Sequence, residues 1–475
     1  MNREKNLVKN TIIISVGIIC TKLITFLLLP LYTGILSTEE YGIVDLFNTI
    51  VSLLLPIITF QSEQAIFREL IECREDKEEK KKIISSGVTS VIYQSIIFLI
   101  LFLLFSLIFK NKYSIYLIIN IIASVFSFLF LQISRGFGDN KTYSIGCFIS
   151  AFFTILFNVL FLVVLNLKVE GMLLGTFIGQ ILCFFYLFFK LKIYDYYSTK
   201  MFDKKIVKRL WIYSVPLIPN AISWWIFSSS DRVIVSSILG LSMNGILSVA
   251  SKFSVIYVTL YNVFDRSWIE SVSLHINDHD IEDYFNKIFN VVFKIFSSLI
   301  LLLIVFMPII YPIMIGEKFK AGYSLVPILL VASLFTVCQG VVAVVYAAKK
   351  DTKAIAKTSI LAAIFNIIIH LGLIKFIGIY AAAISTFMAY FIIFIYRVID
   401  IRKKYLNIKF NKSYLFTFTI ILLFVLASYY LNNFILNSLM MIIILVVTVV
   451  INYDMICIAY KTGINKIKNV KVRRT

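Results

Sequence analysis

The stretch "IICTKLITFLLLPLYTG", residues 18–34, places a single lysine, Lys22, inside a run that is apolar enough to lie in a bilayer. The whole chain has the same character: 60% of its 475 residues are hydrophobic and only 15% are charged, with a mean hydropathy of +0.91. Soluble domains have about 45–50% apolar and about 25% charged residues. The composition therefore predicts an all-α polytopic membrane protein with no sizeable soluble domain.

A helix needs about 20 apolar residues to cross a bilayer, and the apolar runs of this chain predict fourteen spans. These cover residues 11–34, 41–66, 83–109, 113–133, 143–166, 171–190, 212–238, 245–266, 288–315, 323–347, 354–375, 377–396, 413–431 and 434–459.

Lysine and arginine residues predict the orientation of these spans. If the N-terminus is cytoplasmic, the cytoplasmic segments hold 35 of the 46 Lys and Arg residues and the outside loops hold 6. This asymmetry favours a multi-pass protein with both termini in the cytoplasm, and the net charge of +20 also suits anionic membrane lipids. The basic residues are dispersed through short loops, so no nucleic-acid partner is expected.

An internal repeat organises the chain. "LSTEEYGIVDLFNTI" (36–50) aligns with "LGLSMNGILSVASKF" (239–253) at an offset of 203, and two later matches have similar offsets. Six spans in each repeat imply parallel halves around a central cavity. We predict an N-terminal six-helix lobe at 1–209, a C-terminal six-helix lobe at 210–400, and two additional helices with a basic cytoplasmic tail at 401–475.

Polar residues form a stripe on the second predicted span. They recur every three or four residues, which puts them on one helix face: Asp45, Asn48, Ser52, Pro56, Thr59 and Glu63. The equivalent positions of the second repeat are again largely polar: Ser248, Ser251, Val255, Thr259, Asn262 and Arg266. Polar contacts between packed helices would explain the Ser and Thr residues. A water-filled cavity explains the charged residues better, because a charge at the membrane centre costs about 2.5–3.5 kcal/mol.

Lys22 is then interpreted as a cavity residue. It lies about twelve residues into the first predicted span, too deep to reach either surface easily, and Lys252 occupies the second repeat's helix. Asp231 and Arg232 add an adjacent acid and base, with pairing to each other or to a neighbouring helix as the alternative. His370 is interpreted as a helix-contact residue rather than a proton relay.

Several chemistries have no support in the sequence. No P-loop pattern is present, so ATP is not expected to drive the protein directly. The six cysteines are scattered singly, so neither a disulfide nor a metal site is expected. No cofactor is expected, and the short outside loops argue against an enzyme such as a glycan polymerase.

Two stretches resemble a known family. "KLITFLLLPLYTGILSTEEYGIVDLF" (22–47) is similar to the opening of the Wzx-type polysaccharide flippases, which belong to the multidrug/oligosaccharidyl-lipid/polysaccharide exporter superfamily. "SSSDRVIVSSILGLSMNGILSVASKF" (228–253) resembles the start of that family's second half. The resemblance covers roughly residues 7–400. It implies two six-helix lobes and a bacterial inner-membrane flippase for undecaprenyl-diphosphate-linked oligosaccharide, working by alternating access and coupled to an ion gradient.

On this interpretation the cationic side chains would hold the diphosphate and aromatic rings would stack on sugars. The candidates for substrate binding are Lys22, Lys252, Arg232, Arg266, Trp224 and Tyr257, and those for H⁺ or Na⁺ coupling are Asp45, Glu63 and Asp231. A polysaccharide polymerase and glycosyltransferases would be partners. Two alternatives remain: a flippase for lipid II or another cell-wall precursor, and a cation or drug antiporter of the same superfamily.

Overall fold

The computed structural model describes residues 22–108, 111–453 and 457. Within these residues the chain is all-helical, and 13 helices are long and apolar enough to cross a membrane. A shorter apolar helix, Lys22–Ile35, precedes them. It is the described end of the first predicted span, of which residues 11–21 lie outside the described part. The predicted fold class, an all-α polytopic membrane protein, is confirmed.

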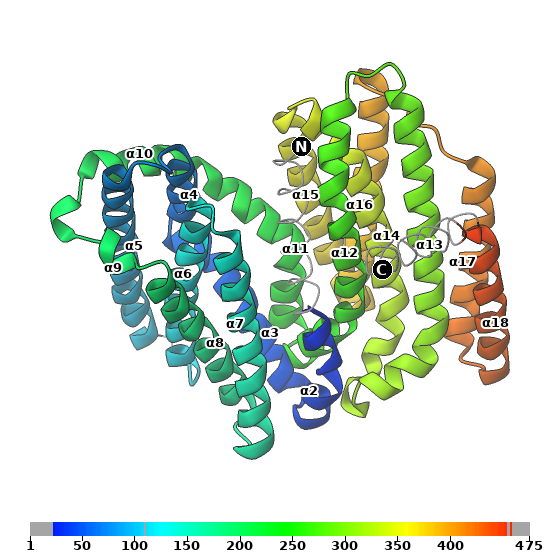
Figure 1. Ribbon diagram of the computed structural model, residues 1–475. Helices are drawn as coiled ribbons and strands as arrows, with labels where there is room; N and C mark the ends of the chain where they lie inside the picture. Colours follow the sequence, from blue (N-terminus) through cyan, green and yellow to red (C-terminus); the bar gives the residue numbers. More distant parts are fainter. Residues whose placement is uncertain (1–21, 109–110, 454–456, 458–475) are drawn as a thin grey trace, which may run out of the picture. The chain divides into compact units, whose positions relative to one another are not determined.

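The chain divides into two compact units, and unit 1 comprises residues 1–252 and 367–382. The elements wholly inside it (Figure 1) are α2 (Leu29–Ile35), α3 (Thr38–Ile58), α4 (Ser62–Glu72), α5 (Lys77–Ile108), α6 (Ser114–Gly136), α7 (Asn140–Val159), the π-helical turn η1 (Leu160–Val164), α8 (Lys168–Lys190), α9 (Ile193–Tyr196), the 3-10 turn η2 (Thr199–Met201), α10 (Lys204–Ser214), the 3-10 turn η3 (Val215–Leu217) and α11 (Ile218–Ile238).

Unit 2 comprises residues 253–366 and 383–475. The elements wholly inside it are α13 (Ile281–Met314), the 3-10 segment η4 (Glu317–Leu325), α14 (Val326–Ala348), α17 (Lys412–Leu431) and α18 (Phe434–Ile451). Three further helices contribute residues to both units: α12 (Leu241–His275), α15 (Thr352–Ile377) and α16 (Tyr380–Lys404).

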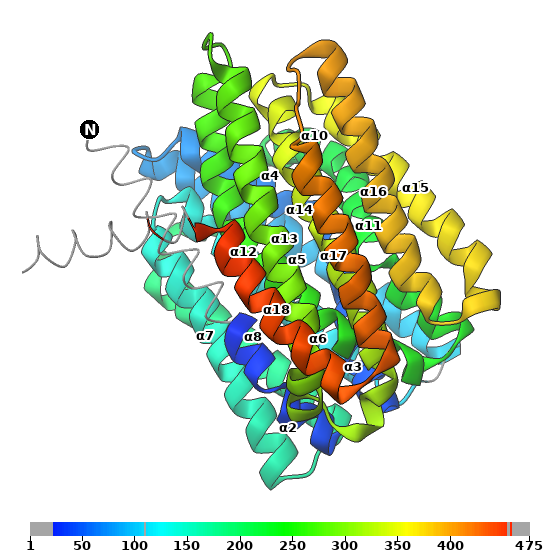
Figure 2. The same cartoon turned by 90° about the vertical axis from the view of Figure 1, so that its right-hand side faces the viewer.

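The core of unit 1 lies where α4, α5, α6 and α10 pack together. Ile66 and Leu70 of α4 are fully buried there. Close packing depends on small residues, because a Cβ added at Gly87 would press on Ile66 and one added at Gly136 would press on Leu70. In unit 2, α17 and α18 lie along α13 (Figure 2), and the hydroxyls of Ser297 and Tyr414 hydrogen-bond at 2.7 Å.

Helix α3 begins with a capping box. The Ser37 hydroxyl accepts from the Glu40 backbone N–H at 3.1 Å, and the Glu40 carboxylate accepts from the Ser37 N–H at 2.8 Å. These two bonds satisfy donors that a helix start leaves open. The sequence "LSTEEYG" therefore fixes where α3 begins. Its repeat equivalent α12 begins at Leu241, which lies 203 residues after Thr38.

The second predicted span, 41–66, is too long at its C-terminal end. Helix α3 ends at Ile58, and Phe60 and Gln61 adopt positive φ angles of 51° and 57° before α4 begins at Ser62. Left-handed backbone at two consecutive non-glycine residues ends an α-helix. Glu63 therefore belongs to a separate helix and not to the membrane-spanning α3.

Most of the prolines lie at helix starts or breaks and not in helix interiors. Pro30, Pro219 and Pro327 occupy the first turn of α2, α11 and α14, where a helix does not need the missing N–H. Pro216 lies in the 3-10 turn η3 that separates α10 from α11, so the predicted span 212–238 contains a break near its start. Helix interiors contain only the remaining three, Pro56, Pro308 and Pro312.

Candidate functional site

Unit 1 brings together the starts of the two repeat-equivalent helices, α3 and α12. A Cβ added at Gly42 would overlap the backbone carbonyl oxygen of Leu241, and one added at Gly245 would overlap that of Thr38. Gly42 and Gly245 are 203 residues apart, as are Thr38 and Leu241, so the contact is the same from either helix. The Asn244 amide donates to the Gly42 carbonyl at 3.0 Å. The two helices therefore meet backbone to backbone.

One turn further along, the same two helices carry an acid with its partners. The Ser248 hydroxyl donates to the Asp45 carboxylate at 2.5 Å, and Asp45 and Ser248 are again equivalent positions of the repeat. The Arg232 guanidinium of α11 forms an ion pair with Asp45 at 2.9 Å, and it donates to the Ser251 hydroxyl at 3.3 Å. Asp45 is therefore bound by two helices at once.

Asp231 uses a different partner from its neighbour Arg232. Consecutive helical residues leave the axis about 100° apart, and the Asp231 carboxylate lies 2.8 Å from Nδ1 of His370 on α15. The His370 side chain is fully buried, and its Nε2 has no hydrogen-bond partner among the described residues. Asp231 and Arg232 thus pair with neighbouring helices and not with each other. The contact of His370 with α11 agrees with its interpretation as a helix-contact residue.

Two lysines leave the site with excess positive charge. Lys252 of α12 is half-buried and interacts electrostatically with Asp45, Arg232 and Lys22. Within the described part of the chain, neither Lys22 nor Lys252 has a carboxylate within ion-pair distance. We use "charge cluster" for Lys22, Asp45, Asp231, Arg232, Lys252 and His370. Its two carboxylates already contact Arg232 and His370, so both ammonium groups are free to bind an anion.

The other candidates in unit 1 lie in different surroundings. Glu63 is 2% exposed, and one of its carboxylate oxygens has no hydrogen-bond partner among the described residues. Burial raises the pKa of Glu63, although a hydrogen bond with Thr59 lowers it in part, so this carboxyl takes up a proton more readily than a solvated one. Trp224 is exposed beside Phe227. The neighbouring Trp225 binds α3, because its indole N–H donates to the Thr49 carbonyl at 3.0 Å.

Two candidates belong to unit 2. The Tyr257 ring is fully buried, its hydroxyl donates to the Phe296 carbonyl at 3.1 Å, and its ring packs edge-on against Phe296. This ring has no accessible face in this conformation and serves packing. Arg266 is exposed on α12.

The sequence partly indicates the site residues that were not among the predicted candidates. Gly42 and Gly245 are identical residues at equivalent positions of the repeat alignment. The alignment does not predict that the backbones of the two helices are in contact. His370 is the only histidine within an apolar span, which marks it as a candidate partner for a buried acid. Nothing in the sequence distinguishes Trp225 from Trp224.

We predict that breaking the Asp45–Arg232 pair destabilises the protein. Asp45 and Arg232 side chains are only 11% and 20% exposed, so Arg232→Ala should lower the free energy of unfolding by about 3 kcal/mol, the lower end for a buried pair. The double variant Asp45→Asn/Arg232→Gln should lose much less, because no charge remains unpaired. Thermal unfolding in detergent measures both effects.

The exposed pair Arg68–Glu72, with side chains 56% and 65% exposed, provides the control. Arg68→Ala should change stability by less than about 1 kcal/mol. Equal losses for Arg232→Ala and the double variant would contradict a stabilising ion pair.

Comparison with known proteins identifies related sequences and folds. Residues 7–269 match the profile of a family described as "Polysaccharide biosynthesis protein". No curated protein matches the chain. Among solved structures, a lipid II flippase MurJ in an inward closed conformation is 16% identical with a TM-score of 0.68, covering 94% of this chain and 100% of that one.

A second solved structure is an inward-facing multidrug resistance MATE family transporter of the MOP superfamily. It is 12% identical, with a TM-score of 0.65, and the match covers 79% of this chain and 94% of that one. The outward-facing conformation of a MATE family transporter gives a TM-score of 0.56 at 13% identity. The chain therefore has the fold of these multi-pass membrane proteins.

Proposed function

We propose that this chain, which belongs to the polysaccharide biosynthesis protein family, is a flippase for a lipid-linked oligosaccharide. Its substrate would be undecaprenyl-diphosphate-linked repeat units, moved from the cytoplasmic to the outer leaflet by alternating access. The likeness in fold to a flippase and to transporters supports transport and not catalysis.

The excess positive charge of the charge cluster is the observation that carries this proposal. Lys22 and Lys252 have no carboxylate within ion-pair distance among the described residues, although both lie on apolar helices. An ammonium group in a membrane is costly unless water or an anion satisfies it. A diphosphate provides at least two negative charges and several acceptor oxygens, and charge-assisted hydrogen bonds to these are strong. The cluster is thus suited to a polyanionic headgroup.

Coupling to an ion gradient is the second part of the proposal. Asp231 is the best-placed candidate, because its carboxylate is largely buried and lies 2.8 Å from the His370 imidazole. Asp45 and Glu63 remain further candidates. Asp45 is already held by Arg232 and Ser248, whereas Glu63 retains an unpaired oxygen. Either H⁺ or Na⁺ could act at these carboxylates.

The proposed substrate implies a cellular location and partner enzymes. We place the protein in a bacterial inner membrane with both termini cytoplasmic, where glycosyltransferases would supply its substrate and a polysaccharide polymerase would consume its product. The cationic excess argues against a cation or drug antiporter, because like charges repel a cationic substrate. Lipid II or another cell-wall precursor carries the same diphosphate, so this cluster would serve it equally well.

Reconstitution into vesicles tests the proposal. The purified protein should move a labelled polyprenyl-diphosphate oligosaccharide between leaflets, at a rate that rises when an H⁺ or Na⁺ gradient is imposed. Asp231→Asn should remove that rise. Movement of a cationic dye but not of the lipid-linked sugar would contradict the proposal and favour the antiporter.

A further inference from the structure

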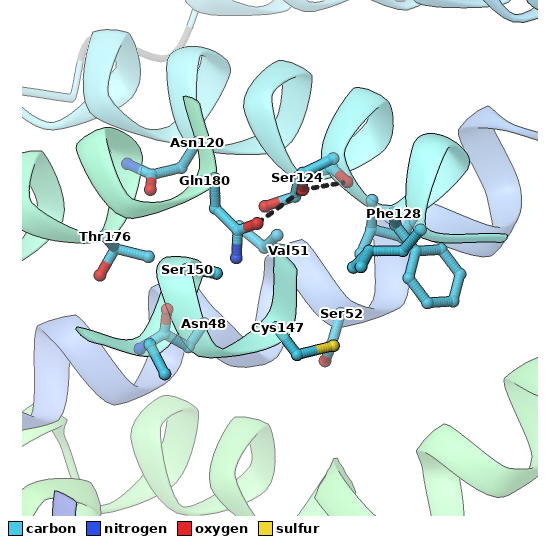
Figure 3. Close-up of a pocket in the computed structure, with 14 residues that line it drawn as sticks. Asn48, Val51, Ser52, Asn120, Ser124, Phe128, Cys147, Ser150, Thr176 and Gln180 are labelled. Atoms are coloured by element: carbon cyan, nitrogen blue, oxygen red, sulfur yellow. Dashed lines mark hydrogen bonds between the residues drawn. The ribbon is translucent and has the colours of Figure 1, made fainter. Parts of the chain in front are cut away.

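A cavity of about 390 Å³ lies inside unit 1, next to the charge cluster but separate from it. Helices α3, α6, α7 and α8 surround it, and Figure 3 shows the side chains that line the space. Its volume is within the ~300–1,000 Å³ range typical of small-molecule sites. The cavity is therefore large enough for a ligand group and not merely a packing defect.

The lining of this cavity is uncharged and combines polar groups with a larger apolar surface. None of its 14 residues is Asp, Glu, Lys, Arg or His, whereas eight carry a hydroxyl or a carboxamide. A charged ligand would lose its hydration there without gaining an opposite charge, which is strongly unfavourable. A neutral ligand that offers hydroxyl groups would instead find donors and acceptors. The lining selects for an uncharged, hydroxyl-rich group.

The Gln180 side chain is held so that it presents donors to the cavity. Its carbonyl oxygen accepts a hydrogen bond from the Ser127 hydroxyl at 2.5 Å, and the Ser127 side chain also contacts the Ser124 carbonyl at 3.2 Å. With its oxygen engaged, the amide directs its nitrogen toward the centre of the cavity (Figure 3). The two amide N–H groups are therefore positioned to donate to a ligand hydroxyl.

The opposite rim adds a second carboxamide. Asn48 of α3 is exposed, and its side chain has no hydrogen-bond partner among the residues that the structure describes. Apolar surface completes the lining, with Phe128 and Leu131 contributed by α6. A few oriented polar groups within an apolar wall are the usual composition of a specific small-molecule site. A sugar ring matches this wall, because it has hydroxyls at its edge and C–H groups on its faces.

The cavity begins where the charge cluster ends. Asn48 follows Asp45 by three residues on α3, a rise of roughly 4.5 Å. Ser52, a turn beyond Asn48, lines the cavity and also accepts a hydrogen bond from the Trp225 indole at 3.1 Å. A diphosphate bound at the cluster would therefore place the next group of the substrate at the mouth of the cavity.

We propose that this cavity binds an uncharged sugar residue of the lipid-linked glycan, while the charge cluster binds the diphosphate. The inference rests on the proposed function and adds the substrate class that one subsite recognises. Gln180 and Asn48 would donate to sugar hydroxyls, and Phe128 would cover one face of the ring. The cavity would thus distinguish a glycosylated lipid from the bare lipid diphosphate.

Two substrates and one substitution test this subsite. Vesicles containing the full-length protein are given a polyprenyl diphosphate that carries one neutral sugar, or the same lipid diphosphate without the sugar. Gln180→Leu keeps a side chain of similar size but removes the amide. We expect it to slow transport of the glycosylated lipid about tenfold and to leave transport of the bare lipid within twofold of wild type.

Thr419→Val provides the control. Thr419 is an exposed residue of α17 in unit 2 whose hydroxyl donates to the Leu415 carbonyl of the same helix, and the variant should transport both lipids as wild type does. Equal loss of both lipids in Gln180→Leu would assign Gln180 a structural role and overturn the subsite. Unchanged transport of both would also overturn it. If the wild-type protein moves neither lipid, the proposed function itself fails, and that result is distinct from either outcome with the variant.

Discussion

Lys22→Ala is expected to reach the membrane at the wild-type level and to lose at least nine-tenths of its transport of lipid-linked oligosaccharide. The lysine carries one of the two ammonium groups without an acidic partner among the described residues, and removing it takes away one of the two charges that would bind the diphosphate. Insertion should not suffer, because deleting a charge from a membrane helix favours insertion by about 2.5–3.5 kcal/mol. Accumulation of the lipid-linked oligosaccharide on the cytoplasmic leaflet measures the loss.

The choice of substitution separates charge from size. Lys22→Arg keeps the charge but changes the donor geometry, so it should retain part of the transport, whereas Lys22→Gln should not. Lys357→Ala is the matched control, because Lys357 is also an exposed lysine on a membrane-spanning helix but lies in the second turn of that helix, α15. If Lys22→Gln transports as well as Lys22→Arg, then Lys22 acts through packing and the diphosphate-binding role is wrong.

Gly245→Ala is expected to destabilise the protein by about 3 kcal/mol or more and to reduce the yield of folded protein in detergent. A single added Cβ overlaps the Thr38 carbonyl oxygen, and a backbone atom cannot move aside as the end of a flexible side chain can. Overpacking typically costs about 1–3 kcal/mol, and a clash between two backbones belongs at the upper end. Gly42→Ala should behave alike, because it meets Leu241 in the same way.

For glycines in open surroundings, substitution by alanine is expected not to destabilise the protein. A Cβ added at Gly34 of α2 or at Gly372 of α15 would meet no atom of the described residues within 4 Å. Alanine is the better helix former by about 1 kcal/mol, so Gly34→Ala and Gly372→Ala should leave stability unchanged or raise it. Thermal unfolding of the four variants in detergent makes the comparison. Four equal effects would mean that helix propensity, and not the α3–α12 contact, controls stability.

The sequence predicts which glycines are equivalent but not which of them are in contact. The repeat alignment at an offset of 203 marks Gly42 and Gly245 as equivalent, and the offset also relates Thr38 to Leu241 at the two helix starts. An alignment states that two segments are alike, but it does not state that they touch. The contact arises because both helices lack a Cβ at the same level, which allows their backbones to approach.

Helix boundaries were likewise predicted only in part from the sequence. Hydropathy predicts the membrane spans well, since each crossing needs a long apolar run and this requirement acts locally along the chain. The end of α3 is predicted wrongly, because Thr59 and Glu63 continue the three- and four-residue polar spacing of the helix past Ile58, although Phe60 and Gln61 adopt left-handed backbone. Backbone conformation at such a bend depends on packing beyond the segment.

The sequence by itself determined the solvent and the all-helical, multi-pass class, because hydropathy and periodicity are properties of each helix alone. It also identified most charged residues of the charge cluster, because a charged residue inside an apolar run can be recognised without knowledge of the tertiary structure. Only the tertiary structure decided how they pair: Arg232 with Asp45, Asp231 with His370, and the two lysines with neither. Pairing depends on which helix faces meet, and residues more than a hundred positions apart meet through packing that no single stretch of sequence encodes.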